Sequence, residues 1–208
     1  MPLFPSKSYS DAGEYLADYA NAVAQAFASI DADALRRAAD CLEQAVRRKA
    51  TIFVCGNGGS AAISNHFLCD HMKGVRNGTD FHPKVASLST NMEILTAIAN
   101  DIGYEHVFDF QLSSLASKDD VLVAISSSGA SPNILKALGW ARAHGVTSIC
   151  MSGFEGGEGR RLADIALHVD AQNYGVVEDV HQSLMHILAQ FMRQRHLPDP
   201  GLMGRLKF

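Results

Sequence analysis

From residue 51 onward, short apolar segments alternate with segments that have the periodicity of a helix. Strands that alternate with helices pair in parallel, and a parallel sheet needs helices on both of its faces. The pattern therefore predicts an α/β fold in three layers, with a doubly wound, five-stranded parallel sheet. The expected strands lie near residues 51–55, 85–89, 121–126, 147–152 and 165–170. The expected helices lie near residues 60–73, 92–99, 104–116, 132–144 and 177–195.

Two further helices are expected ahead of the first strand, between residues 8 and 49. Apolar residues recur in both at helical spacing, and Asp31 or Asp33 is suited to cap the second helix. Their apolar faces exceed what a small sheet domain needs to cover, so we expect them to pack in a homo-oligomer. The chain is divided into an N-terminal helical extension (1–50), an α/β domain (51–196) and a C-terminal tail (197–208).

Composition excludes several classes of protein. The 208 residues are 47% hydrophobic and carry a net charge of −4 without a basic stripe, which favours a globular core over nucleic-acid binding. The first residues lack the pattern of a signal peptide, and no apolar run is long enough to cross a membrane. The four cysteines show no metal or disulfide spacing, and Cys69 is expected to be buried. We therefore expect a cytoplasmic protein with reduced thiols that associates with neither nucleic acid nor a membrane.

A glycine-rich loop, Gly56-Asn57-Gly58-Gly59-Ser60, links the first strand to its helix. Small residues let backbone N–H groups approach an anion, and a helix N-terminus adds partial positive charge. With Ala61 the loop also fits the G-x-G-x-x-A dinucleotide pattern, but the next strand ends without the acidic residue that would bind a ribose. We therefore expect no nicotinamide or flavin cofactor. The loop is interpreted as a ligand site formed by Asn57, Gly58, Gly59 and Ser60, with a purely structural turn as the alternative.

A second loop, rich in serine, follows the third expected strand. It contains Ser126, Ser127 and Ser128, and Ser131 is expected to cap the helix that starts at Pro132. Serine is a poor strand residue but a good anion ligand beside a helix N-terminus, although the hydroxyls could instead only satisfy a turn. Ligands of parallel sheets bind beyond the carboxyl ends of the strands, where both loops lie. The two loops together indicate a small phosphorylated ligand, with its phosphate at one loop and its body at the other.

Several ionisable residues lie on the helices that flank these loops. His66 and Asp70 are four residues apart and share one helix face, whereas Glu178 and His186 are about 12 Å apart along the last helix. Two imidazoles and two carboxylates are a plausible ligand set for Zn²⁺, provided that Glu178 and His186 lean together or that neighbouring subunits contribute. A carboxylate and a histidine on opposite sides of a sugar could also move a proton between neighbouring carbon atoms.

The two loops resemble those of the sugar isomerase (SIS) domain, and the resemblance extends from about residue 15 to residue 195. Residues 96–101, residues 154–157 and the histidine-rich last helix resemble the phosphoheptose isomerases. The resemblance implies conversion of sedoheptulose 7-phosphate to D-glycero-D-manno-heptose 7-phosphate, the first step toward heptose units of bacterial surface polysaccharide. It also implies a homotetramer with active sites at subunit interfaces, and zinc in some members. The acid/base pair of the family falls on Asp70 and His186, and its serines fall on Ser60, Ser126, Ser128 and Ser131.

The chain departs from the family pattern at several positions. Asp70 replaces a glutamate, Glu178 replaces a glutamine and Asn91 replaces an aspartate, while Lys73 lies beside the place of a missing arginine. Glu178 and Asn91 are still expected to bind substrate. These changes leave two alternatives open: an isomerase of a different phosphosugar, or a non-catalytic SIS module that binds a sugar phosphate or a protein partner. The presence of His186 favours an enzyme over a binding module.

Overall fold

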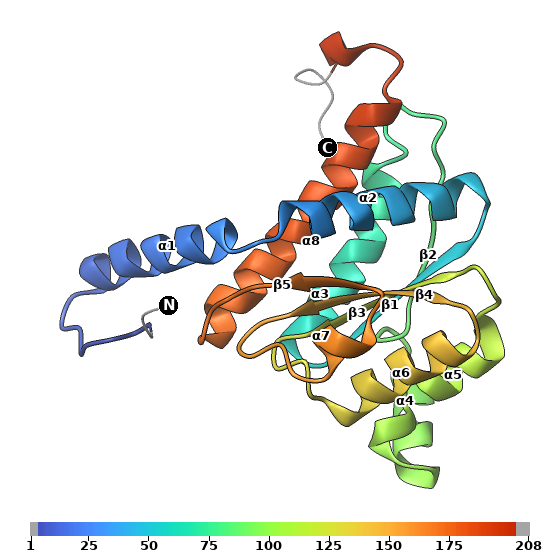
Figure 1. The fold of residues 1–208 in the computed structure, drawn as a ribbon, viewed down its shortest axis with the longest axis horizontal. Helices are drawn as coiled ribbons and strands as arrows, with labels where there is room; N and C mark the ends of the chain where they lie inside the picture. Colours follow the sequence, from blue (N-terminus) through green and yellow to red (C-terminus); the bar gives the residue numbers. More distant parts are fainter. Residues whose placement is uncertain (1–3, 203–208) are drawn as a thin grey trace.

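The computed structural model describes residues 4–202 and contains one parallel sheet of five strands (Figure 1). The strands are ordered β2-β1-β3-β4-β5 across the sheet, so the chain winds outward in both directions from β1 and β3. The predicted doubly wound, five-stranded α/β fold is confirmed. The strands are β1 (Thr51–Gly56), β2 (Lys84–Ser87), β3 (Val121–Ser126), β4 (Thr147–Ser152) and β5 (Ile165–His168).

Helices cover both faces of the sheet. One face carries α2 (Ala32–Arg47), α3 (Gly59–Cys69) and α8 (Tyr174–His196), as Figure 1 shows, and α1 (Ala12–Ala28) packs against α8. The opposite face carries α4 (Met92–Asp101), α5 (Asp109–Leu115) and α6 (Pro132–Ala143). The shorter elements are α7 (Gly159–Leu162), the π-helical turn η1 (Asp70–Gly74) and the 3₁₀ turns η2 (Tyr104–His106) and η3 (Pro200–Leu202).

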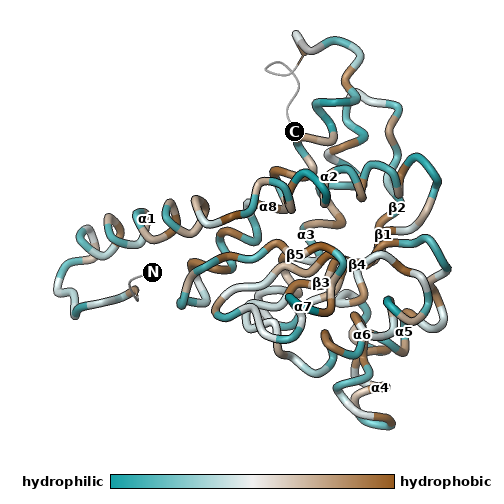
Figure 2. Tube along the Cα trace, in the orientation of Figure 1, coloured by the Kyte–Doolittle hydropathy of each residue, from teal (hydrophilic) through white to brown (hydrophobic). Residues whose placement is uncertain are grey.

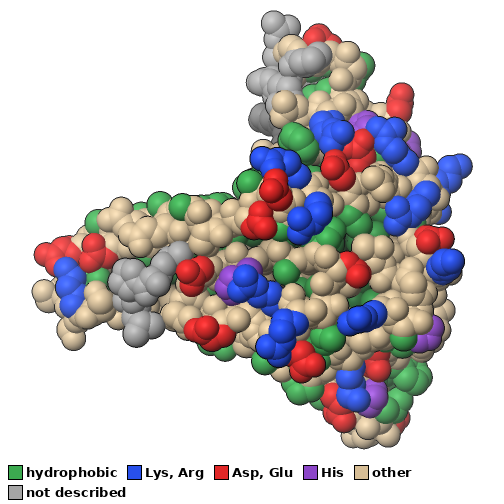
Figure 3. Space-filling model, in the orientation of Figure 1, with side chains coloured by type: hydrophobic (Ala, Val, Ile, Leu, Met, Phe, Trp, Pro, Cys, Tyr) green, Lys and Arg blue, Asp and Glu red, His purple; other side chains and the backbone are tan. Residues whose placement is uncertain are grey.

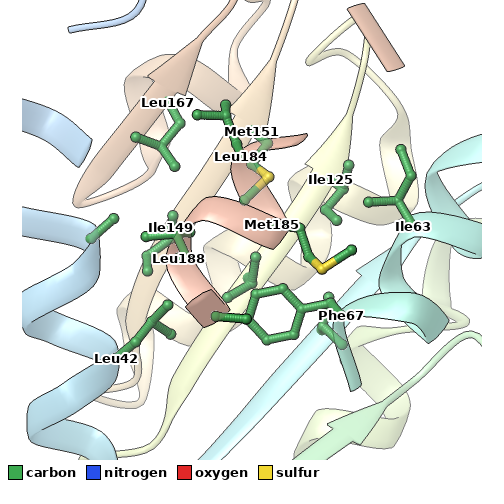
Figure 4. Packing of buried hydrophobic residues seen from close by; sticks show 14 of the residues in the cluster. Leu42, Ile63, Phe67, Ile125, Ile149, Met151, Leu167, Leu184, Met185 and Leu188 are labelled. Atoms are coloured by element: carbon green, nitrogen blue, oxygen red, sulfur yellow. The ribbon is translucent and has the colours of Figure 1, made fainter. Parts of the chain in front are cut away.

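Two hydrophobic cores result from the alternation of side chains along each strand. Ile52 and Val54 point into the core under α2, α3 and α8, whereas Phe53 and Cys55 point into the core under α5 and α6. In Figure 4, Leu42, Phe67, Leu184 and Met185 bring three helices together over strand residues Ile125, Ile149 and Met151. The strands are accordingly hydrophobic along much of their length, and polar residues gather on outer loops and helix faces (Figure 2). This packing fixes α3 and α8 beside each other on one face.

Helix α1 projects away from the body of the molecule (Figure 1). Ala26 is its only fully buried residue, and Leu16 is 67% exposed. The hydroxyl of Tyr19 donates a hydrogen bond of 2.6 Å to Asp179 Oδ2, which ties α1 to the start of α8. Hydrophobic side chains lie along the edge of this projection (Figure 3), so much of the apolar face of α1 is uncovered by its own chain.

The element boundaries differ from expectation where local hydrogen bonding overrides periodicity. The helix expected at 104–116 is divided into η2 and α5, because the buried Val107 and Phe108 turn the chain into the core between them. The helix expected at 60–73 changes to π geometry after Cys69, with Val75 N–H donating to the carbonyl of Asp70 at 2.9 Å. Of the two residues expected to cap α2, Asp31 does so, and its side chain accepts a hydrogen bond from the backbone N–H of Asp33.

The short helix α7 was not expected from the sequence, and α8 begins at Tyr174 rather than near residue 177. The early start of α8 follows from its cap, since the side chain of Asn173 accepts a hydrogen bond from Val176 N–H. The expected C-terminal tail, residues 197–208, lies partly outside the described residues, which end at 202. Within the described residues, no helix combines the length and the apolar character needed to cross a membrane.

Candidate active site

Helices α3 and α8 lie side by side, and their facing residues follow the same order along both helices. Because the order is preserved, the two helices run parallel and present one continuous seam. The beginning of the seam lies at the loop after β1, at the carboxyl edge of the sheet, where ligands of such folds bind. The facing pairs are Gly59 with Glu178, His66 with Gln182, and Asp70 with His186.

Asp70 is the centre of a cluster of polar side chains along this seam. Its Oδ2 atom lies 2.7 Å from Nδ1 of His186, and its Oδ1 atom lies 3.3 Å from Nε2 of His66. The two imidazole rings meet edge to face, with their centroids 4.9 Å apart. Gln182 closes the cluster, with its amide nitrogen 2.9 Å from Nδ1 of His66 and 3.0 Å from Nε2 of His186. Sequence reasoning identified the first three residues but missed Gln182.

The position of Asp70 follows from the local geometry of the chain. As expected from a four-residue spacing, His66 and Asp70 share a helix face and contact each other. Asp70 is also the first residue of the π turn η1, and it is buried, whereas His66 is exposed. Single π turns within helices are frequent at functional sites. The turn therefore holds a carboxylate in the protein interior with both oxygens directed at histidines.

Asp70 and His186 do not lie on opposite sides of a substrate space, which corrects the expectation from sequence. Their nitrogen and oxygen are 2.7 Å apart, so no ligand fits between them within one chain. The reason is the close packing of α3 against α8. The two side chains instead form one hydrogen-bonded pair, in which a carboxylate holds an imidazole.

A polar cavity of about 130 Å³ lies at the beginning of the seam. It brings together the two loops that the sequence analysis identified, because both strands end at the same edge of the sheet. Tyr174, at the start of α8, adds an aromatic wall that sequence reasoning missed. The cavity is lined by Asn57, Ser60, Ile125, Ser126, Ser127, Ser128, Ser131, Tyr174 and Glu178.

Serine hydroxyls in this cavity can still donate to a ligand, although Ser126 and Ser128 each accept a hydrogen bond of 3.2 Å from a backbone N–H group. Ser127 Oγ is buried and has no hydrogen-bond partner among the described residues. Ser131 occupies the N-cap position of α6 as expected, but its side chain makes no capping bond and lies 3.4 Å from Ser126 Oγ. A buried hydroxyl without a partner is unfavourable by itself, so an anion that accepts hydrogen bonds would relieve this cost.

The serine loop is held in place by the segment around Gly156, one of the motifs that carry the family resemblance. Gly129 has a φ of +63°, and a Cβ there would overlap the carbonyl of Gly156. Two backbone bonds complete the contact, from Gly159 N–H to the Gly129 carbonyl and from Gly153 N–H to the Ser127 carbonyl, both at 2.8 Å. Glycine is therefore required at position 129 for both conformation and space.

Asn57 holds the glycine loop against the start of α6. Its side-chain amide exchanges two hydrogen bonds of 2.9 Å with the side-chain amide of Asn133. The hydroxyl of Tyr104 also donates to Asn57 Oδ1, at 2.9 Å. Sequence reasoning placed Asn57 among the ligand-binding residues but missed both partners. The position of Asn133 in the first turn of α6 was the available signal, whereas nothing in the local sequence marks Tyr104.

Three of the clustered residues can hold a cation. His66, Asp70 and His186 each offer one ligand atom, and these atoms all lie within 4.8 Å of one another. Imidazole nitrogen and carboxylate oxygen are ordinary Zn²⁺ ligands, so the donor set fits that ion. Glu178, expected as a fourth ligand, lies instead in the serine-lined cavity, because two helical turns separate it from His186.

Comparison with known proteins agrees with this architecture. The family model of the SIS domain matches residues 14–153. A phosphoheptose isomerase from Helicobacter pylori strain P12 is 38% identical over 165 residues, covering 78% of this chain and 83% of that protein. The chain belongs to the phosphoheptose isomerases of the SIS domain family. A relative of the same name from Nitratidesulfovibrio vulgaris is 41% identical over 143 residues, covering 69% of this chain and 68% of that protein.

Solved structures of phosphoheptose isomerases share the fold of this SIS domain protein. The enzyme from Neisseria gonorrhoeae matches with a TM-score of 0.79 and 29% identity, over 87% of this chain and 96% of that one. The enzyme from Francisella tularensis matches with a TM-score of 0.81 and 26% identity, over 88% of this chain and 96% of that one. The matched region of the family model begins at residue 14, so it takes in α2 and nearly all of α1.

The structure shows where the residues that depart from the pattern of the phosphoheptose isomerases lie. Burial, with a smaller contribution from neighbouring Asp179, raises the pKa of Glu178 in the cavity. Asn91 lies outside the cavity, where its side chain caps α4 by accepting from Ile94 N–H at 3.0 Å. Cys69, expected to be buried, is exposed, because it lies on the outer side of the last turn of α3.

Proposed function

We propose that this chain is an aldose–ketose isomerase that converts sedoheptulose 7-phosphate to D-glycero-D-manno-heptose 7-phosphate. The observation that carries the proposal is the 2.7 Å hydrogen bond between His186 and Asp70, on the same helix pair that lines the serine cavity. The relatives named phosphoheptose isomerase support the substrate class. Asp70 and Glu178, which replace a glutamate and a glutamine of the family pattern, affect the chemistry of the site and leave the fold unchanged.

The serine-lined cavity is assigned to the phosphate group. The hydroxyls of Ser126, Ser127, Ser128 and Ser131 surround it, and the N-terminus of α6 adds partial positive charge. In a ketoheptose 7-phosphate, the phosphate and the carbonyl lie at opposite ends of the carbon chain. The cavity and the Asp70 cluster are separated along α8 in the same way, by about 12 Å of helix. A long sugar phosphate is therefore favoured over a short one.

The proton transfer is assigned to His186, with Asp70 as its partner. Interconversion of the two sugars requires a proton to leave C1, an enediol to form, and a proton to return at C2. Asp70 accepts the N–H of His186 at Nδ1, so Nε2 of the same ring carries the lone pair that can take a proton. The carboxylate of Asp70 also stabilises the imidazolium that forms. In other active sites, a group that orients the catalytic base has the same role.

His66, Asp70 and His186 are proposed as ligands of Zn²⁺. When bound, it would polarise the carbonyl and hydroxyl oxygens of the sugar as a Lewis acid. The residues themselves orient the sugar at the seam, and Glu178 lies at the phosphate end.

A homotetramer is also proposed, because α1 leaves apolar residues uncovered. Tyr15 and Leu16 on α1, and Ile187 and Phe191 on α8, are all exposed. Exposed apolar surface of this kind marks sites of association, and closed symmetry is the usual outcome for identical subunits.

The experiment that tests the proposed function is conversion of sedoheptulose 7-phosphate by the purified full-length protein. We expect an aldoheptose 7-phosphate to form without any nicotinamide. The assay is run once with added Zn²⁺ and once after treatment with a chelator. Solvent deuterium should enter the product at C2 if the proton is exchanged at an enediol. Failure to convert the substrate at high protein concentration, with intact binding of the sugar phosphate, would indicate a binding module instead.

A further inference from the structure

Gln182 lies between the two histidines of the Asp70 cluster, and its amide nitrogen contacts both. The distances are 2.9 Å to Nδ1 of His66 and 3.0 Å to Nε2 of His186. A side-chain amide nitrogen carries two N–H groups and accepts nothing. Both ring nitrogens must therefore be acceptors, each using its lone pair toward Gln182.

The far side of each ring completes the assignment. His66 Nε2 lies 3.3 Å from Asp70 Oδ1, and His186 Nδ1 lies 2.7 Å from Asp70 Oδ2. A carboxylate only accepts, so these two ring nitrogens donate. Each neutral imidazole thus has one donor and one acceptor nitrogen, and every facing atom has a complementary partner. The four side chains form a closed hydrogen-bonded ring, defined here as His66, Asp70, Gln182 and His186.

We propose that Gln182 is a positioning residue that fixes the tautomers of both histidines and that competes with a divalent cation for their lone pairs. A neutral imidazole binds a metal through its unprotonated nitrogen. In the closed ring, the unprotonated nitrogens of His66 and His186 are both directed at the Gln182 amide. Two imidazoles can bind one ion through these atoms only after Gln182 turns away.

The surroundings of Gln182 allow such a movement. Gln182 is only partly buried, and His66 is exposed, so the amide can leave the ring toward solvent. The ring is also built by matched spacing, since His66 and Asp70 are four residues apart on α3 and Gln182 and His186 are four residues apart on α8. Gln182 can therefore be replaced by another residue without disturbing the backbone of either helix.

The closed ring also bears on proton transfer, a part of the inference that rests on the proposed function. The same interaction that occupies His186 Nε2 keeps this atom in the form that can take a proton. Gln182 therefore maintains the reactive tautomer of His186 before substrate or cation arrives. Its loss should leave the protein folded but the rings free to change tautomer.

The test uses the metal-free, full-length protein and the variants Gln182→Leu and Gln182→Glu. Ser183→Ala is the control, since Ser183 is the next residue on α8 and its hydroxyl bonds to the Asp179 carbonyl within its own helix. The imidazole nitrogen signals report the tautomers directly in ¹⁵N NMR, and competition with a chromogenic chelator gives the affinity for Zn²⁺. Neither measurement involves substrate, so failure here is distinguishable from failure of the isomerase assay.

In the parent and in Ser183→Ala, we expect the Nε2–H tautomer at His66 and the Nδ1–H tautomer at His186. In Gln182→Leu, His66 and His186 should each populate both tautomers, and Zn²⁺ should bind roughly tenfold more tightly because two neutral hydrogen bonds no longer compete. Gln182→Glu should bind Zn²⁺ at least as tightly as the leucine variant, since it replaces the competing donor by a carboxylate ligand. Parent-like tautomers or parent-like Zn²⁺ affinity in Gln182→Leu would overturn the proposal.

Discussion

The carboxylate of Glu178 lies directly against Gly59, the first residue of α3. A Cβ at position 59 would overlap the Glu178 carboxyl group, so any larger residue there would force the end of this flexible side chain to move. The contact brings the acidic side chain to the end of the helix dipole that attracts negative charge. It also determines where Glu178 lies, beside the serine cavity and away from the Asp70 cluster.

This relationship predicts a change of sign in a double-mutant cycle. Gly59→Ala should destabilise the protein by about 1 kcal/mol, the low end for overpacked sites, because only the end of the flexible Glu178 side chain has to move. In a Glu178→Ala background, the same change should be neutral or stabilising by up to about 1 kcal/mol, because alanine then only restricts the unfolded chain. Urea unfolding measures both values. Gly139→Ala on α6 is the control, since a Cβ there meets nothing within 4 Å, and equal effects of Gly59→Ala in both backgrounds would contradict the contact.

The serine cavity predicts a loss of phosphate affinity. Ser126→Ala and Ser128→Ala should each weaken sugar-phosphate binding by about ten- to a hundredfold, because a hydrogen bond to a charged group is worth roughly 1.5–3 kcal/mol. Isothermal titration measures the affinity. Ser113→Ala, on the exposed side of α5, should bind like the parent. Unchanged affinity in both cavity variants would place the phosphate elsewhere.

The Asp70–His186 pair predicts a loss of turnover. Asp70→Asn and His186→Ala should each lower kcat by at least about 10²-fold, the lower limit for a positioned acid or base. The double variant should lose little more than either single variant, because the two side chains act as one unit. Metal content is measured in parallel, and His82→Gln at an exposed position is the control. Additive losses in the double variant would contradict a coupled pair.

Buried histidines predict a decrease in stability at acid pH. Burial lowers the pKa of His181 and that of His71 to about 4. Below the ordinary histidine pKa of about 6.5, the unfolded chain binds protons that the folded chain does not, so the free energy of unfolding falls as pH falls from about 6.5 to about 4. The loss is at most roughly 3 kcal/mol for each residue, from about 1.4 kcal/mol per pKa unit.

Urea unfolding at several pH values tests this prediction. His181→Leu should remove a large part of the pH dependence in that range but not all of it, because His71 and His168, whose pKa values burial also lowers, still contribute. His82→Gln should keep the full dependence of the parent. A parent-like pH profile in His181→Leu would show that His181 does not carry this effect.

The uncovered face of α1 predicts association. Light scattering should show a tetramer at micromolar concentration, and Leu16→Glu should shift it toward smaller species by placing charge in an apolar contact. Met92→Glu is the matched control, because Met92 on α4 is also 67% exposed, as Leu16 is. A monomeric parent would contradict the proposed assembly.

The sequence by itself determined the fold class and the place of the ligand loops. Alternating strand and helix periodicities are local properties, and parallel strands must bring their carboxyl ends to one edge, so the glycine and serine loops had to meet. The His66–Asp70 contact was predictable for the same reason, since a spacing of four residues on a helix sets it without any tertiary packing.

Only the tertiary structure decided the contacts between helices. Gln182 meets His66, Glu178 meets Gly59, and Asp70 meets His186 because α3 and α8 pack in one register, and each of these pairs spans more than a hundred residues of chain. Side-chain periodicity predicts which face of a helix is buried, but it does not encode the axial position of one helix against another. That position depends on how the apolar side chains between the helices and the sheet interlock, and it decides which polar residues share a site.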